Sequence, residues 1–108
     1  MISLSGVFQL KWYIGDYVDD LVYFNTPLYY LPNLEDERYL DPLRKSQIVL
    51  CSGQGRWEEI SVSDLNMMEQ VLIRKEIPVW VDFWGWDVDH DWPWWRKEFP
   101  YFIGQMKI

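Results

Sequence analysis

The chain has 108 residues, the size of one domain, and 49% of them are hydrophobic and 19% aromatic, which argues against disorder. The formal net charge of −7 argues against direct binding of nucleic acid through a basic patch. No apolar run is long enough for a membrane span, and the N-terminus lacks the basic start of a secretory signal. One cysteine, Cys51, excludes an internal disulfide, so we expect a cytoplasmic protein that forms a single domain over residues 1–108.

The first quarter of the chain predicts a hairpin. Residues 8–14 alternate between apolar and polar side chains, which is the period of a half-buried strand. Gly15 and Asp16 mark a turn, and residues 21–24 are rich in side chains that favour strands. We therefore expect residues 21–24 to return as the second strand, with a short helix over residues 16–24 as the alternative.

Three prolines interrupt residues 25–46 and prevent any long regular element there. We expect a brief edge strand at residues 28–31 and a single helical turn at residues 35–40. Residues 35–37 form an acidic run that ordinarily lies in a solvated loop.

The middle of the chain predicts two strands and the main helix. Residues 47–52 have the apolar character of a buried strand, and the glycines at 53 and 55 mark a turn into a partner strand at residues 57–62. Ser63 is placed to cap a helix that ends near residue 76, with apolar side chains on one stripe. The helix is expected over residues 63–76.

The last third predicts a strand, a short helix and a closing strand. Residues 78–84 alternate with apolar side chains on both faces, as in an interior strand. Asp91 is a favourable cap for a helix over residues 92–99, and residues 101–108 are expected to close the sheet. Together these elements predict an α+β domain: an antiparallel sheet of about five or six short strands, with the main helix packed on it.

The stretch from Pro78 to Trp95 is the most unusual part of the sequence. It contains six of the eight tryptophans, four aspartates and the single histidine, His90, and it has no lysine or arginine. Asp82 lies between two tryptophans on one strand face, so it needs a partner, either an internal Lys or Arg or a cationic group of a binding protein. Residues 16–37 are a second segment with acids and no bases, and the two segments would form one negative face if they met.

Catalytic and metal-binding interpretations of these residues are weaker. Asp87, Asp89, Asp91 and Glu98 match four oxygen-ligand positions of a calcium loop, but the position that requires Gly holds Trp92. We therefore expect a solvated loop, no metal and no cofactor. Cys51 next to Gly53 lacks a nearby base for nucleophilic chemistry, so a buried structural cysteine is expected, and no spacing of carboxylates specifies an enzyme.

The sequence thus favours a small acidic, Trp-rich binding module that occludes a basic partner, such as a nuclease or another nucleic-acid-handling enzyme. Immunity proteins against toxins and phage-encoded inhibitors of host defence act in this way. The alternatives are a module that binds a small molecule or carbohydrate through residues 80–95, and a homodimeric structural protein. We expect no contact with nucleic acid or membrane. The candidate partner-binding residues are Asp82, Trp84, Trp86, Asp87, Asp89, Asp91, Trp92, Trp94, Trp95, Glu35, Asp36 and Glu37.

Overall fold

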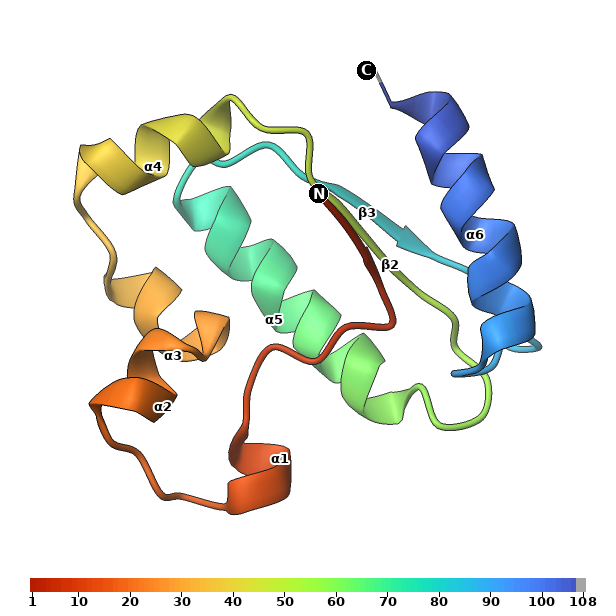
Figure 1. Cartoon of the computed structure of the whole chain (residues 1–108), viewed down its shortest axis with the longest axis horizontal. Helices are drawn as coiled ribbons and strands as arrows, with labels where there is room; N and C mark the ends of the chain where they lie inside the picture. Colours follow the sequence, from red (N-terminus) through yellow and green to blue (C-terminus); the bar gives the residue numbers. More distant parts are fainter. Residues whose placement is uncertain (107–108) are drawn as a thin grey trace.

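A small parallel sheet lies at the centre of the computed structural model, which describes residues 1–106 (Figure 1). Its three strands are β1 (Ile2–Leu4), β2 (Val49–Ser52) and β3 (Trp80–Phe83), in the order β1-β2-β3. Both strand pairs are parallel, with Ser3 opposite Leu50 and Leu50 opposite Val81. The mixture of helices and strands was predicted correctly, but the antiparallel sheet of five or six strands is wrong. Parallel neighbours require a crossover, and here both crossovers contain helices.

The first crossover consists of short helices where the sequence predicts a hairpin and an edge strand. The helices are α1 (Lys11–Ile14), α2 (Asp20–Phe24), α3 (Pro27–Tyr30), the 3₁₀ turn η1 (Leu31–Asn33) and α4 (Glu37–Arg44). Asp19 caps α2 by accepting a hydrogen bond from the amide of Val22, and Pro27 occupies the first turn of α3. The hairpin is therefore wrong, and α2 falls within the alternative short helix. The predicted turn at residues 35–40 is the start of α4.

The second crossover is α5 (Glu59–Arg74), which confirms the main helix but begins four residues before the predicted start at residue 63. The partner strand expected at residues 57–62 does not form. Trp57 has a left-handed backbone (φ 64°), which turns the chain into the helix directly after the loop. Ser63 therefore lies inside α5 and does not cap it. Within residues 1–106, no helix combines the length and the apolar character needed to cross a membrane.

The last helix, α6 (Trp92–Gln105), starts where the sequence predicts and is longer than expected. Asp91 caps it by accepting a hydrogen bond from the amide of Trp92 at 2.8 Å. The helix continues past Pro100, so the closing strand at residues 101–108 is wrong as far as residue 105; residues 107 and 108 lie outside the described part. Phe102 explains the extension, because a helix buries its ring completely against the sheet.

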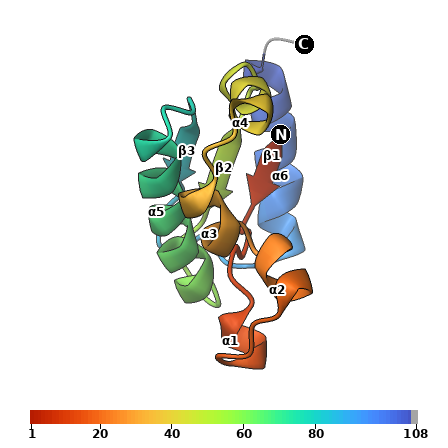
Figure 2. The ribbon, with the colours of Figure 1, turned by 90° about the vertical axis from the view of Figure 1, so that its left-hand side faces the viewer.

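The sheet is covered on both faces, with α5 on one side and α6 on the other (Figure 2). Leu50 of β2 belongs to the larger core with α5, while its neighbours Val49 and Cys51 contact Phe102 of α6. This alternation follows from the two-residue period of a strand. The α6 side is thus a second core layer, in which Trp84 packs edge-on against Tyr101.

Candidate functional site

The Trp-rich stretch forms β3, the loop after it and the first turn of α6. Because the strands are parallel, their carboxyl ends meet at one edge of the sheet, and this loop lies there. Backbone hydrogen bonds fasten the loop to residues 53–56: the amide of Gly55 donates to the carbonyl of Val88, and the amide of His90 donates to the carbonyl of Arg56. Both glycines of the 53–55 turn are needed for this contact, because a Cβ on Gly53 would lie 2.2 Å from the carbonyl oxygen of Val88.

Most of the aspartates in this stretch are engaged within the chain. Asp82 accepts a hydrogen bond from the indole nitrogen of Trp84 at 3.2 Å, and no Lys or Arg of residues 1–106 forms an ion pair with it. Asp89 accepts one from the backbone amide of Arg56 at 2.7 Å, and Asp91 caps α6. Asp87 is exposed and is the only one of the four that forms no hydrogen bond or ion pair with the described residues. Three of the four carboxylates therefore contribute to the local fold.

The tryptophans of the stretch divide into packed and exposed rings. Trp84 packs on Tyr101, and Trp95 packs edge-on against His90 and donates its N–H to the hydroxyl of Ser5. Trp94 is half-buried, with the Lys97 ammonium 4.8 Å from its ring centre. Trp86 and Trp92 are the most exposed rings, at 80% and 64% of their surface, and Trp80 is 37% exposed. Some indoles beside aspartates therefore do reach solvent, as the binding interpretation requires.

Cations also lie at this edge of the molecule. The Arg56 guanidinium is 3.8 Å from a carboxylate oxygen of Asp89, and Arg96 and Lys97 follow the tryptophans on α6. In the sequence the stretch 76–95 has no bases, but the fold brings Arg56 to it from the neighbouring loop. The Trp-rich edge thus carries mixed charge, which weakens its case as a docking site for a basic protein.

A buried carboxylate, Glu58, is the centre of the polar network at the same edge. It accepts hydrogen bonds from the hydroxyls of Ser5 (2.8 Å) and Ser52 (3.0 Å), and His90 Nδ1 lies 2.7 Å from its other oxygen. In a catalytic triad the histidine lies between the serine and the carboxylate, so that it can take the hydroxyl proton. Here the carboxylate lies between Ser52 and His90. The network therefore joins β1, β2 and the 84–91 loop without forming a nucleophile.

Cys51 is buried next to a second buried carboxylate, and it does not have the properties of a nucleophile. Its sulfur lies 3.0 Å from Glu98 Oε2, and burial together with the charges of Glu98, Asp82 and Glu58 raises the pKa of the thiol. Burial also raises the pKa of the Glu98 carboxyl, whose Oε1 has no hydrogen-bond partner among the described residues. A thiol that stays protonated is inert, as expected for a structural cysteine.

The calcium-loop pattern is not realised as a site. Glu98 is buried and faces Cys51, while Asp91 caps α6 and Asp89 binds a backbone amide. Nowhere in residues 1–106 do three or more His, Cys, Asp or Glu side chains come together in a way that could hold a metal ion.

The other predicted acids, Glu35 to Glu37, lie in the loop before α4 and at its first residue. Asp36 caps α4 and pairs with the Arg38 guanidinium at 2.7 Å, which lowers the pKa of its carboxyl. Glu37 pairs with Arg44. Glu35 forms no hydrogen bond or ion pair with the described residues. This acidic run lies on the far side of α5 from the Trp-rich loop, so the two acidic segments do not form one face (Figure 1).

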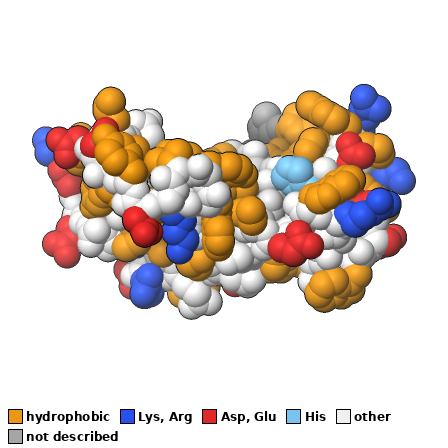
Figure 3. All heavy atoms as spheres, turned by 90° about the horizontal axis from the view of Figure 1, so that it is seen from below, with side chains coloured by type: hydrophobic (Ala, Val, Ile, Leu, Met, Phe, Trp, Pro, Cys, Tyr) orange, Lys and Arg blue, Asp and Glu red, His pale blue; other side chains and the backbone are white. Residues whose placement is uncertain are grey.

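The first crossover instead builds a surface of its own, which we term the acidic aromatic surface. Every residue from Leu10 to Leu21 is exposed. Tyr13 and Leu21 expose 69% and 75% of their area. No Lys or Arg occurs between residues 12 and 37. The name covers the exposed aromatic, leucine and acidic residues of α1, α2, the adjoining loops and α4: Tyr13, Asp16, Tyr17, Asp19, Asp20, Leu21, Phe24, Glu35 and Tyr39. Figure 3 shows hydrophobic and acidic side chains at this end of the molecule, with some Lys or Arg side chains among them, and hydrophobic and mixed charged side chains at the other end.

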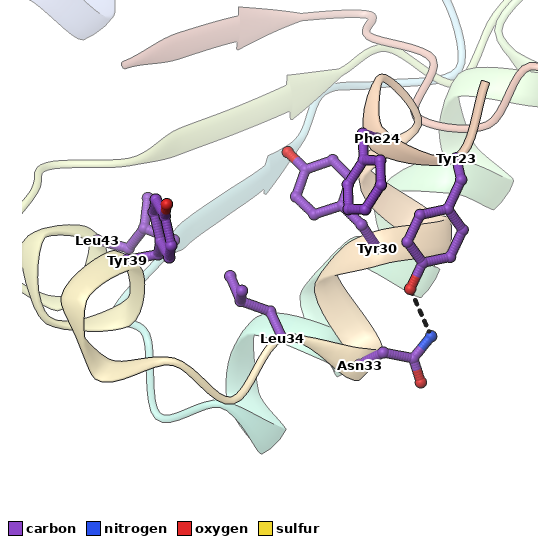
Figure 4. A pocket seen from close by; sticks show the side chains of 7 residues that line it. All are labelled: Tyr23, Phe24, Tyr30, Asn33, Leu34, Tyr39 and Leu43. Atoms are coloured by element: carbon purple, nitrogen blue, oxygen red, sulfur yellow. Dashed lines mark hydrogen bonds between the residues drawn. The ribbon is translucent and has the colours of Figure 1, made fainter. Parts of the chain in front are cut away.

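A pocket of about 560 Å³ opens where α2, η1 and α4 meet within this surface (Figure 4). Its walls come from α2, α3 and α4, and the side chains gather around an open centre. The hydroxyl of Tyr23 accepts a hydrogen bond from the Asn33 amide at 3.0 Å, which ties α2 to η1 on one side. The lining residues are Tyr23, Phe24, Tyr30, Asn33, Leu34, Tyr39 and Leu43.

Sequence reasoning identified Glu35, Asp36 and Glu37 but missed the aromatic part of this surface. The hairpin interpretation placed residues 8–24 in two strands of a half-buried sheet, so Tyr13, Tyr17 and Phe24 were not considered for binding. The available signal was the pairing of aromatic residues with Asp16, Asp19 and Asp20 in a segment without bases. No protein-family model, curated protein or solved structure matches the chain.

Proposed function

We propose that this protein is a small cytoplasmic binding module that occludes the basic site of a partner protein through the acidic aromatic surface. The partner would be a nuclease or another nucleic-acid-handling enzyme, because such enzymes present clefts rich in Lys and Arg. The observation that carries the proposal is the exposure of large aromatic side chains among six acids, Asp16 to Glu37, with no base in the same segment.

Exposure of this extent is unusual for a protein that acts alone. A contiguous exposed apolar patch commonly marks an interaction site, and Tyr and Trp are enriched at the centres of interfaces. Leu21 and Phe24 are more than two thirds exposed, although their burial would stabilise the fold. Their position is explained if a partner covers them.

The charges give the expected direction of recognition. Asp16, Asp20 and Glu35 form no ion pair or hydrogen bond with the described residues, so their charge is available to a cationic partner. Carboxylates would take the place of nucleic-acid phosphates against Arg and Lys, while the aromatic rings exclude water from the contact. Such pairs raise the association rate and become weaker as salt rises.

Two matched triple variants test the proposal. The first neutralises the surface with Asp16→Asn, Asp20→Asn and Glu35→Gln. The control removes three charges elsewhere, with Glu69→Gln, Glu76→Gln and Asp87→Asn. The measurement is the binding of a panel of basic nucleases, and of basic proteins that are not nucleases, at low and high salt.

We expect at least one nuclease to bind the wild type, with an affinity that falls as salt rises. The surface variant should bind it about tenfold more weakly, because three exposed ion pairs at roughly 0.2–1 kcal/mol each correspond to about that factor. The control variant should bind like the wild type. Equal loss in both variants, or binding that is independent of salt, would show that the surface does not act in this way.

A second candidate function is small-molecule binding at the Trp-rich edge. A hollow of about 270 Å³ lies beside the exposed Trp86, with Gln54, Glu58 and Glu59 supplying polar groups. An aromatic wall with a few polar groups suits a carbohydrate. Titration with a panel of sugars, followed by tryptophan fluorescence in the wild type and in Trp86→Leu, tests this alternative; a response that Trp86→Leu retains would reject it.

A further inference from the structure

We propose that the pocket between α2, η1 and α4 receives an arginine-bearing segment of the partner. The inference rests on the proposed function and specifies which partner side chain the acidic aromatic surface binds. The volume of about 560 Å³ lies within the range of about 300–1,000 Å³ usual for ligand pockets. It is large enough for a short piece of chain, so the arginine would enter together with a neighbouring residue.

The walls of the pocket favour a planar cation. Tyr23, Phe24, Tyr30 and Tyr39 line it with four aromatic rings, which Figure 4 shows around the opening. A guanidinium group stacks on aromatic faces and is more weakly hydrated than an ammonium group, so it loses less on entering such a site. The rings alone would also accept an apolar side chain. The polar groups decide between a cationic and an apolar occupant.

The polar groups of the pocket can all accept hydrogen bonds. Asn33 uses its amide nitrogen to donate to the Tyr23 hydroxyl and to the carbonyl of Tyr29, which leaves its side-chain oxygen available as an acceptor. The hydroxyls of Tyr30 and Tyr39 form no hydrogen bond with the described residues and can accept as well. Arginine carries five N–H donors and no acceptor, so it complements this set.

The charge around the pocket acts in the same direction. No Lys or Arg lines it, and Glu35 follows the lining residue Leu34 directly in the chain. The neighbouring cations Arg38 and Arg44 are already paired with Asp36 and Glu37. A cation at the pocket mouth would therefore meet a net negative potential. This potential would stabilise a bound cation but would not stabilise a neutral or anionic segment.

The test uses three blocked hexapeptides that differ only at two positions, occupied by arginine, lysine or citrulline, the last being a neutral analogue of arginine. Their binding to the wild type, to Tyr39→Leu and to Phe99→Leu is measured by titration, with backbone amide shifts read by NMR. Tyr39 is an exposed pocket wall, so its replacement should leave the fold intact. Phe99 of α6 is also an exposed aromatic residue, lies outside the acidic aromatic surface and does not line the pocket.

We expect the arginine peptide to bind the wild type about tenfold more tightly than the lysine peptide, which corresponds to about 1.4 kcal/mol, and the citrulline peptide to bind most weakly. Shifts should centre on Tyr23, Asn33 and Tyr39. Tyr39→Leu should remove the preference for arginine, while Phe99→Leu should keep it.

The failures of the two proposals are distinguishable. Salt-dependent binding of the arginine and lysine peptides with equal affinity, or a preference that survives in Tyr39→Leu, overturns the pocket inference alone. Absence of binding by every peptide, together with absence of nuclease binding, overturns the proposed function and the inference with it. If the protein dimerises without peptide and Tyr39→Leu abolishes the dimer, the pocket binds a second copy of the chain. That result would overturn the arginine assignment.

Discussion

Asp64 is a completely buried carboxylate of α5, and replacing it by Ala is expected to lower the free energy of unfolding by about 4 kcal/mol. It accepts hydrogen bonds from the backbone amides of Phe8 (2.7 Å) and Gln9 (3.2 Å). It also accepts from the Gln9 side-chain amide (2.7 Å) and the Trp12 indole nitrogen (3.0 Å). One side chain thus fixes the segment that leads from β1 to the acidic aromatic surface.

The magnitude follows from the donors left behind. Each buried donor without an acceptor costs roughly 1–3 kcal/mol, and hydrogen bonds to a charged group are at the upper end. The Trp12 side chain is partly exposed, so its indole nitrogen can hydrogen-bond to water after the substitution. Most of the cost therefore comes from the backbone amides of residues 8 and 9 and from the Gln9 side chain. Water entering the vacated space offsets part of the sum, which gives about 4 kcal/mol. Asp64→Asn keeps the shape and one acceptor oxygen, so it should cost roughly half as much.

Urea denaturation at neutral pH, followed by tryptophan fluorescence, measures the free energy, and hydrogen exchange at the amides of Phe8 and Gln9 measures the local effect. Both amides should exchange faster in Asp64→Asn. Asp41→Ala is the control, because Asp41 is an exposed partner of Lys45 and its loss should cost less than about 1 kcal/mol. A cost below about 1 kcal/mol for Asp64→Ala, or unchanged exchange at both amides, would refute the assigned role.

Three further changes test the other end of the molecule. Burial raises the pKa of Glu98 above that of a free Glu, so the folded state holds this proton after the unfolded chain has lost it. Stability should therefore fall as pH rises from the pKa of the unfolded chain through that of the folded state, and subtraction of Glu98→Gln unfolding curves should isolate this slope. Asp91→Ala should cost about 1 kcal/mol in thermal unfolding through loss of the α6 cap, while Asp87→Ala, without a partner among the described residues, should change stability by less than about 0.5 kcal/mol. Gly53→Ala should lower the free energy of unfolding, measured in urea, by more than about 2 kcal/mol, because the added Cβ would clash with the Val88 carbonyl. An unchanged free energy of unfolding would contradict the tight contact between the two loops.

The parts of the fold that the sequence predicted correctly are those with strong local signals. The apolar run of β2, the alternation of β3, the apolar stripe of α5 and the cap of α6 at Asp91 all lie close to their expected positions. Cys51 is buried, as predicted from its apolar neighbours. In each case the local preference of the chain agrees with its tertiary packing.

The errors arise where distant contacts decide the conformation. Residues 8–14 alternate like a strand, but their backbone is held by Asp64, more than fifty positions away. α1 to α3 have four or five residues each, too short for a helical period to appear. The segment Tyr101–Ile103 favours a strand by composition, and burial of Phe102 against the sheet keeps it helical. No local pattern reports such contacts.

The candidate site was predictable in composition but not in position. Counting Trp and Asp draws attention to residues 78–95, and there the fold uses Asp89 and Asp91 for its own hydrogen bonds and supplies Arg56 as a counter-charge. Whether an aromatic side chain is exposed depends on the packing of the whole domain. Leu21 and Phe24 are apolar, as core residues are, and only the structure shows that they face solvent.

The acids of this chain therefore fall into two groups with separable effects. Asp64 and Glu58 are buried and join loops to the core, and the buried Glu98 joins α6 to Cys51 of β2, so removal of these acids changes stability. Asp16 and Asp20 are exposed and without partners among the described residues, and their charge repels its neighbours in the free protein. Neutralising the exposed group should leave the free energy of unfolding unchanged or slightly raised while it weakens binding. A weaker binding without a loss of stability distinguishes a docking surface from a structural one. Replacement of a structural acid would instead lower the free energy of unfolding and weaken binding together.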